Sequence, residues 1–518
     1  MYLSAGQLFP FYFGALLLLF SIILFRQEKT NKALWLLFSG AIIIGFGMAR
    51  LDPFLCLWDE QYHALVAKNM IAYPFKPMLY ADPLFGYDIS NWTANHIWLH
   101  KPPLFLWPIA LSVKLFGTNA LAVRLPSVVL HGLTALLVYR IGNRTVNATA
   151  GFYGALFFTC AYYPLELMAG KYATDHNDTS FQFYVTASII AWMEFEATGK
   201  RRWWILTGVL AGCAVLVKWL AGLLVYGCWF MAVGADDRKQ WRSIGNYKPF
   251  LSALAVTLAV TAPWYLYTFS RYPEEAKIAF SAHAQHLLIA VEGHGGDFMF
   301  HFRSLSSLYG GGLLVPFIIV GGFVWLILKT KNKKYRWGLL TAVISVYTVY
   351  TIAATKMASF GTVVAPLFYL GLGALADSAL STLELKIKRP YILTATSCIL
   401  LMGTCVLLWK PEKVERYHSF KHPEDNFQRE KDLRQMAFIG RLKKITGNST
   451  VALFNSDIRL EGHIACMFYA DCVAYGSIPS EKELKQAKDL YGAVIVLDDG
   501  RLPDRIRQDQ ELLLIKQD

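Results

Sequence analysis

The residues of this 518-residue chain that call for a chemical explanation are ionisable side chains at the ends of long apolar segments. They are carboxylates, lysines and histidines, namely Asp59, Glu60, His100, Lys101, Asp175, Asp178, Lys218, His286, His294 and Lys356. Charge at or inside a membrane boundary is costly, so such residues usually mark a functional site. A carboxylate can take a proton from an attacking hydroxyl, and lysines can neutralise a departing phosphate. Together they predict displacement of a group from a phosphate.

The acidic pair Asp59–Glu60 and the lysine Lys101 each have a functional and a structural interpretation. The pair opens a segment with helical spacing over 59–70, where acids favour the helix dipole. The functional interpretation is a general base in a low-dielectric pocket. Lys101 stands in HKPP, where it either snorkels to water or binds a phosphate beside a helix N-terminus.

Two acids and two lysines further along the chain likewise have a functional and a structural interpretation. Asp175 and Asp178 precede an apolar run in YATDHNDTSF. The structural interpretation is that Asp178 or Asn177 caps a helix, and the functional one is that one of the two acids steers a cation or orients an acceptor. Lys218 and Lys356 lie among apolar residues, with snorkelling as the structural alternative.

Composition places these residues in a membrane protein. Hydrophobic residues make up 55% of the chain and charged residues 17%, against roughly a quarter charged in soluble domains. The net charge of +13 would suit nucleic acid, but the long apolar runs favour the membrane. Eight cysteines are too few for a disulfide-built scaffold.

About twelve segments are apolar and long enough to be predicted membrane spans. They cover residues 8–25, 33–49, 121–139, 148–166, 179–196, 203–216, 218–233, 249–268, 307–328, 337–354, 358–378 and 391–409. If residues 203–233 formed one helix, the orientation of every later span in the membrane would be reversed. The shorter segments 59–70 and 102–116 are predicted to lie along the membrane surface.

Lysine and arginine collect in alternate loops, which is typical of the cytoplasmic side. With twelve spans, these basic loops all fall on one side. The other side receives the outer loops 50–120, 167–178 and 269–306 and the tail. The net charge is thus a topology signal rather than a nucleic-acid site, and the candidate residues are predicted outside the cytoplasm.

The tail differs in composition and predicts a second domain, so that 1–409 forms a membrane domain and 410–518 a soluble α/β domain. STVALFNS, MFYADCVAY and AVIVLDD predict strands, and SEKELKQAKDLYG predicts a helix that begins after Ser480. Cys466 and Cys472 either form a bridge, which an extracytoplasmic location permits, or remain thiols.

Several segments together resemble the GT-C glycosyltransferases, in particular the branch of protein O-mannosyltransferases and the lipid A aminoarabinose transferase. The matching segments span roughly 45–375 and are WDEQYHALVAKNM, HKPPLFLWPIALSVKLFG, NALAVRLPSVV, YATDHND, AGCAVLVKWLAG, TAPWYLYTFSRYP and TKMASFGTVVAP. The resemblance implies an α-helical multi-pass protein of the inner membrane. It also implies a hexosyl- or pentosyltransferase that moves a sugar from a polyprenyl-phosphate donor to a lipid, glycan or protein acceptor on the outer face.

The resemblance also implies roles for single residues. Asp59 matches the acid of the first outer loop, the general base, and Asp175 or Asp178 matches the acid of the second. Lys101 and Lys356 match lysines near the donor phosphate. Further substrate contacts are expected from Glu60, Tyr62, Lys218 and His286. One base acting in a single displacement implies inversion at the anomeric carbon.

The chain departs from its relatives at residues that bear on a metal cofactor. His100 stands where some relatives have glutamate, so a divalent metal such as zinc, magnesium or manganese would be held by His100 with His294. Solvated loop histidines are the alternative. Phe360 stands where tyrosine is common, and His283 and His286 lie in a loop where several relatives have arginine.

A secondary transporter or flippase for a lipid-linked or anionic substrate is the main alternative function, since the same charges would line its pathway. Two features argue against it: the charges gather on one side of the membrane, and no inverted repeat is evident. A membrane scaffold leaves those charges unexplained. No phosphate-binding G-x-x-x-x-G-K-[ST] loop occurs, which favours a lipid-linked donor over a nucleotide sugar.

Overall fold

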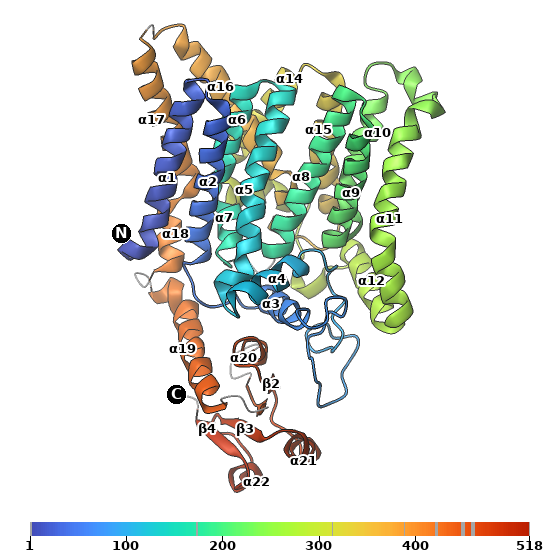
Figure 1. The fold of residues 1–518 in the computed structure, drawn as a ribbon, viewed down its shortest axis with the longest axis vertical. Coiled ribbons are helices and arrows are strands. Elements are labelled where there is room, and N and C mark those ends of the chain that lie inside the picture. Colours follow the sequence, from blue (N-terminus) through green and yellow to red (C-terminus); the bar gives the residue numbers. More distant parts are fainter. Residues whose placement is uncertain are drawn as a thin grey trace.

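The structure is a computed structural model that describes residues 3–171, 175–312, 314–387, 389–419, 423–446, 451–456 and 462–516. A bundle of long helices occupies one part of the molecule, and a small sheet with short helices lies beyond one end of it (Figure 1). This arrangement confirms the predicted α-helical multi-pass fold with a small C-terminal α/β region.

The bundle is built from helices of mostly apolar sequence. They are α1 (Ala5–Arg26), α2 (Thr30–Ala49), α5 (Ala120–Thr145), α6 (Ala148–Thr159), α7 (Tyr162–Met168), α8 (Asp175–Thr198), α9 (Arg201–Lys218), α10 (Leu224–Val233), α11 (Lys248–Arg271), α13 (Phe300–Tyr309), α14 (Val315–Lys329), α15 (Lys333–Ile352), α16 (Ala365–Glu384) and α17 (Pro390–Trp409). Among the described residues, seven helical segments are long and apolar enough to cross a membrane. The total of twelve spans stays a prediction.

The predicted spans 203–216 and 218–233 are two helices, α9 and α10, and not one. They are separated by a 3-10 turn at Trp219–Leu223, and Trp219 has a φ of 56°. A right-handed α-helix requires a negative φ at every residue, so the positive φ of Trp219 ends the α-helix at Lys218. The break leaves Lys218 at the helix terminus, where its side chain can reach a site.

Close contact between helices in the centre of the bundle depends on glycine. A Cβ at Gly142 of α5 would lie 2.2 Å from the Cα of Gly151 in α6, and one at Gly373 of α16 would lie 2.3 Å from the backbone nitrogen of Gly154 in α6. Small residues of this kind let membrane helices approach closely. They hold α5, α6 and α16 together.

Two short helices, α3 (Asp59–Asn69) and α4 (Leu106–Phe116), cross the lower end of the bundle with α12 (Pro273–Leu288) beside them (Figure 1). The prediction that α3 lies along the membrane surface stays a prediction. Within the protein the helix is covered, and residues 59–67 are all buried. The C-terminal region accounts for part of this covering, because α20 (Gly462–Ala470) packs on α3.

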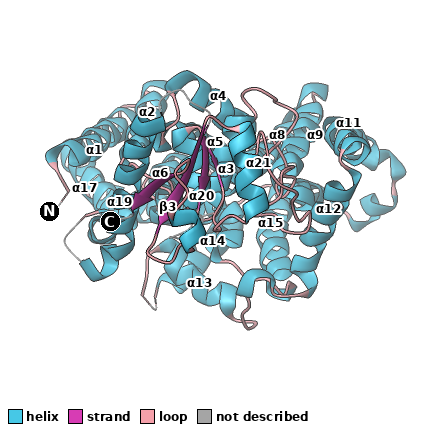
Figure 2. Ribbon diagram, turned by 90° about the horizontal axis from the view of Figure 1, so that it is seen from below, coloured by secondary structure: helices cyan, strands magenta, loops and turns pink. Residues whose placement is uncertain are grey.

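The C-terminal region contains a four-stranded parallel sheet in the order β2-β1-β3-β4, seen from below in Figure 2. Its strands are β1 (Val451–Phe454), β2 (Val473–Ala474), β3 (Ala493–Asp498) and β4 (Leu513–Lys516). The helices in this part of the chain are α18 (Pro411–His418), α19 (Pro423–Thr446), α20, α21 (Glu481–Leu490) and α22 (Asp504–Arg507). The boundary at 409/410 stays a prediction.

The predicted strand in MFYADCVAY is wrong in its first half, because residues 467–470 form the last turn of α20. Only Val473–Ala474 pair as a strand. The helix after Ser480 is confirmed, and the Ser480 side chain accepts a hydrogen bond from the Glu483 backbone N–H at 3.3 Å. Cys472 is a buried free thiol, so it forms no bridge with Cys466.

Hydrogen bonds join the C-terminal region to the lower end of the bundle. The Lys68 ammonium of α3 donates to the carbonyl oxygens of Met467 (2.8 Å) and Phe468 (2.7 Å) in the last turn of α20. It also pairs with Asp471 at 2.5 Å. A cation is favourable at a helix C-terminus, so Lys68 joins the C-terminal end of α3 to the C-terminal end of α20.

A second connection is a buried cluster around Asp52, in the loop between α2 and α3. The Asp52 carboxylate lies 2.6 Å from His418 of α18 and accepts a hydrogen bond from Arg429 of α19, also at 2.6 Å. Although burial raises its pKa, His418 and Arg429 lower the pKa of Asp52 to about 2. His418 also contacts Glu166 of α7 at 3.0 Å.

Candidate active site

Asp59 lies in the first turn of α3, directly after Trp58, which has a positive φ of 75°. Its side chain is buried, and burial raises the pKa of the carboxyl above its usual range. Lys101 and Lys218 oppose this rise by their positive charge. Glu292 and Asp178 add to it by repulsion. Asp59 is therefore surrounded by charges from four other segments of the chain.

The loop that carries Lys101 is held against the end of α9. The Leu104 N–H, three residues after Lys101, donates to the Leu216 carbonyl oxygen at 3.2 Å. Leu216 lies two residues before Lys218. This contact brings the two lysines, which are 117 positions apart along the chain, to the same carboxylate.

Asp178 is one of the two candidates for the acid of the second outer loop. It is buried in the first turns of α8 and forms an ion pair with Lys218. The Lys218 ammonium also lies 5.0 Å from the centre of the Phe360 ring, at cation–π distance. Helix α8 begins at Asp175, whose side chain lies outside the described residues.

Aromatic rings form one wall around Glu292, an acid in the loop between His286 and His294. The Trp92 indole N–H donates to the Glu292 carboxylate at 3.0 Å. His100 stacks on Trp92 with ring centres 4.3 Å apart, and Tyr62 contacts the same ring at 4.9 Å. The acid within the histidine-rich loop was the available signal, but nothing in the sequence shows that it faces Asp59.

The histidines expected to bind substrate or metal lie in this region. His286 of α12 places Nδ1 3.2 Å from the Thr355 hydroxyl, and burial together with Lys101 lowers its pKa. The His294 carbonyl oxygen accepts the Lys356 backbone N–H at 2.8 Å. Among the residues that the structure describes, no three His, Cys, Asp or Glu side chains gather as a metal would require. A metal held by His100 and His294 stays untested.

Lys356 has a different arrangement from the other two lysines. Its ammonium donates to the carbonyl oxygens of Thr351 and Ala353, both at 2.7 Å, at the C-terminal end of α15. Lys356 is not among the main charges that act on the Asp59 carboxyl. The Tyr350 carbonyl oxygen lies 3.4 Å from the same ammonium, so its three N–H donors all face carbonyl groups and a contact with the donor phosphate would require the side chain to move.

Glu60, the neighbour of Asp59, has its carboxylate engaged by Arg124 of α5. Its two oxygens accept hydrogen bonds from Arg124 Nε at 2.8 Å and Nη2 at 3.0 Å, and both side chains are almost fully buried. Although burial raises its pKa, Arg124 and His176 lower the pKa of Glu60 to about 2. In this arrangement Glu60 fixes α3 against α5, and its substrate-binding role stays a prediction. An arginine within the apolar run NALAVRLPSVV was the signal for this pair.

Sequence comparison supports the resemblance over part of the chain. Residues 100–267 match the family model described as dolichyl-phosphate-mannose-protein mannosyltransferase. The undecaprenyl phosphate-alpha-4-amino-4-deoxy-L-arabinose arabinosyl transferase of Pseudomonas aeruginosa (strain UCBPP-PA14) is 30% identical over 251 residues, which are 44% of this chain and 40% of the relative. The chain thus matches less than half the length of this curated relative.

Structure comparison extends over most of the chain. ArnT from Cupriavidus metallidurans bound to undecaprenyl phosphate aligns with a TM-score of 0.61 at 15% identity, over 88% of this chain and 87% of ArnT. The Archaeoglobus fulgidus oligosaccharyltransferase in complex with Zn and sulfate aligns with a TM-score of 0.52 at 12% identity, over 86% of this chain and 62% of that enzyme. The protein therefore has the GT-C fold, and its sequence is related to that of transferases which use polyprenyl-phosphate sugars.

Proposed function

We propose that the protein transfers a pentose or hexose from a polyprenyl-phosphate donor to a membrane-associated acceptor. The observation that carries this proposal is the buried carboxylate of Asp59, with the cations Lys101 and Lys218 acting on it. The names of the related transferases support the donor class. The acceptor is a lipid, a glycan or a protein.

The proposed reaction is a single displacement. Asp59 takes the proton from the acceptor hydroxyl while the hydroxyl oxygen attacks the anomeric carbon. The bond from that carbon to the phosphate oxygen breaks, and its electron pair leaves with the polyprenyl phosphate. Lys101 and Lys218 neutralise the charge that develops on the phosphate. Attack from the face opposite the phosphate inverts the anomeric centre.

The elevated pKa of Asp59 suits this role. A general base is most effective when its pKa approaches the working pH, and burial raises the carboxyl pKa in that direction. Asp178, paired with Lys218, would orient that lysine toward the phosphate. His286 and Tyr62 would contact the sugar or the acceptor from α12 and α3.

We further propose that the site faces the outside of the inner membrane. The basic loops expected in the cytoplasm, such as 26–32 and 140–147, lie at the end of the bundle opposite α3 and α4 (Figure 1). Short loops rich in lysine and arginine usually stay on the cytoplasmic side of a membrane, which supports this orientation.

The test is a transfer assay with purified full-length protein, radiolabelled undecaprenyl-phosphate sugars and a membrane extract. The variant Asp59→Asn should lose on the order of 10²- to 10⁴-fold in transfer rate, the usual contribution of a general base. Asp82→Asn, which changes an exposed acid of the same outer loop, is the matched control and should keep the parent rate. Normal transfer by Asp59→Asn would refute the base assignment.

Two additions to this assay test the remaining alternatives. Movement of labelled donor lipid across a bilayer without transfer would favour a transporter or flippase. Transfer abolished by a chelator and restored by zinc, magnesium or manganese would support a divalent metal, whereas unchanged transfer would remove it from the proposal.

A further inference from the structure

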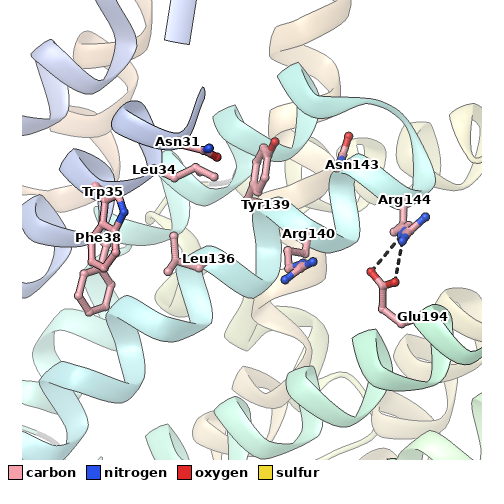
Figure 3. A pocket seen from close by; sticks show the side chains of 10 residues that line it. All are labelled: Asn31, Leu34, Trp35, Phe38, Leu136, Tyr139, Arg140, Asn143, Arg144 and Glu194. Atoms are coloured by element: carbon pink, nitrogen blue, oxygen red, sulfur yellow. Dashed lines mark hydrogen bonds and ion pairs between the residues drawn. The ribbon is translucent and has the colours of Figure 1, made fainter. Parts of the chain in front are cut away.

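A pocket of about 630 Å³ opens between α2, α5 and α8 (Figure 3). The start of α2 and the end of α5, which line it, lie at the end of the bundle opposite the candidate site (Figure 1). Polar residues line the outer part of the pocket. Asn31 stands one residue after the start of α2, and Asn143 and Arg144 lie in the last turn of α5. The reaction proposed above makes no use of this pocket.

The charged side chains of the pocket would be balanced by one singly charged anion. Arg144 donates two hydrogen bonds to Glu194 of α8, at 3.0 and 2.6 Å, and the Glu194 side chain is 6% exposed. Arg140 lies one helical turn before Arg144 on the same face of α5 (Figure 3). In the described ranges of the chain, no carboxylate pairs with Arg140. Two guanidinium groups and one carboxylate give the pocket a net charge of +1.

The deeper part of the pocket is apolar. Phe38 and Leu136 line it seven or eight residues further into the bundle than Asn31 and Arg144, which corresponds to about 10 Å along a helix. The Trp35 ring is 70% exposed on α2, at the level where tryptophan marks the membrane interface. The pocket is therefore polar near the loops and apolar toward the membrane interior.

We propose that this pocket binds an anionic phospholipid that carries a single phosphodiester. The phosphate would lie between Arg140 and Arg144, the headgroup hydroxyls would reach Asn31 and Asn143, and an acyl chain would cover Trp35. Basic pockets between membrane helices on the cytoplasmic side recognise lipid headgroups in this way. A zwitterionic lipid is disfavoured because it brings its own cation next to the guanidinium groups. A soluble phosphate ester leaves the apolar wall uncovered.

The test is native mass spectrometry of the full-length protein in detergent, with phosphatidylglycerol and phosphatidylcholine of identical acyl chains. Phosphatidylglycerol should bind more tightly, and Arg140→Gln should weaken its binding about fivefold, the contribution of one basic residue at an anionic membrane surface. Lys386→Gln removes an exposed charge at the same end of the bundle, outside the pocket, and should bind as the parent does.

Three results would overturn the proposal. They are equal binding of the two lipids, unchanged phosphatidylglycerol binding by Arg140→Gln, and displacement of phosphatidylglycerol by an equal concentration of glycerol 3-phosphate. The last result would indicate a site for small anions in place of a lipid. Transfer activity is not the readout, so the outcome is independent of the function of Asp59.

Discussion

Asp59 shows how a single carboxylate is adjusted by neighbours of both signs. Burial and the negative charges of Glu292 and Asp178 raise its pKa, whereas Lys101 and Lys218 lower it. Each neighbour comes from a different segment of the chain. Substitution of one neighbour should therefore change the protonation of Asp59 without touching Asp59 itself.

The pH profile of kcat/KM should shift in opposite directions when an acidic and a basic neighbour of Asp59 are substituted. If deprotonated Asp59 is the base, activity falls as pH drops through its pKa. Glu292→Gln removes a negative charge, lowers that pKa and should move the acid limb to lower pH. Lys101→Met removes a positive charge and should move the limb to higher pH. Each displacement should be on the order of one pH unit. Shifts in the same direction in both variants would mean that another group controls the limb.

The sequence was informative about this site where chemistry and position coincided. Asp59, Lys101 and Lys218 each stood out as a charge at the end of an apolar run, and the structure places all three together. Glu292 was not recognised as a neighbour of Asp59, because contacts over 233 positions depend on packing that no local pattern encodes. Lys356 differs, because its ammonium binds carbonyl groups only three and five residues before it, a local capping contact that was not among the roles considered for this lysine.

At the scale of elements, the position of Asp59 depends on how α3 is anchored. The Glu60–Arg124 pair ties the first turn of α3 to α5. Arg124 also donates to the carbonyl oxygens of Asp52 at 2.8 Å and Phe54 at 2.7 Å, in the loop that leads into α3. One arginine thus fixes both the helix and its entry.

Loss of this anchor should be costly. Glu60→Gln removes the carboxylate that pairs with the buried Arg124 guanidinium, and breaking a buried ion pair typically destabilises by about 3–5 kcal/mol. Thermal unfolding of the detergent-solubilised protein should show a clearly lower midpoint. Asp297→Asn breaks the exposed pair with Arg303 and serves as the control, since exposed pairs contribute about 0–1 kcal/mol. Equal midpoints for the two variants would contradict the anchoring role of Glu60.

Elements were predicted best where periodicity and capping agreed. The helix after Ser480 has a capping box and polar helical spacing, and α21 begins where expected. MFYADCVAY failed because a short apolar run suits a buried helix as well as a strand. In the structure its first four residues complete α20, which packs on α3 and not in the sheet.

The whole molecule has two chemically different ends. Basic loops and the proposed lipid pocket lie at one end, and the candidate site and the sheet lie at the other (Figure 1). Loop charge favours a cytoplasmic location for the first end, which is the orientation proposed above. The membrane orientation therefore decides whether the acceptor reaches the site from the cytoplasmic or from the outer side of the membrane.

Labelling of single introduced thiols tests this orientation. Lys485→Cys places a thiol on α21 of the C-terminal region, and Ser243→Cys places one in the basic loop between α10 and α11. In intact spheroplasts, a membrane-impermeant maleimide should label the first variant above the background of the parent and should label the second only after permeabilisation. The reverse pattern would place the site in the cytoplasm.

The contact of Lys68 with the last turn of α20 has a consequence for modularity. The helix that carries Asp59 at one end has its other end joined to the C-terminal region. A chain cut after the last bundle helix would lose the carbonyl groups that Lys68 binds and the helix that covers α3. The C-terminal region is therefore no detachable appendage, and an exchange between relatives would have to carry α3 and α20 together.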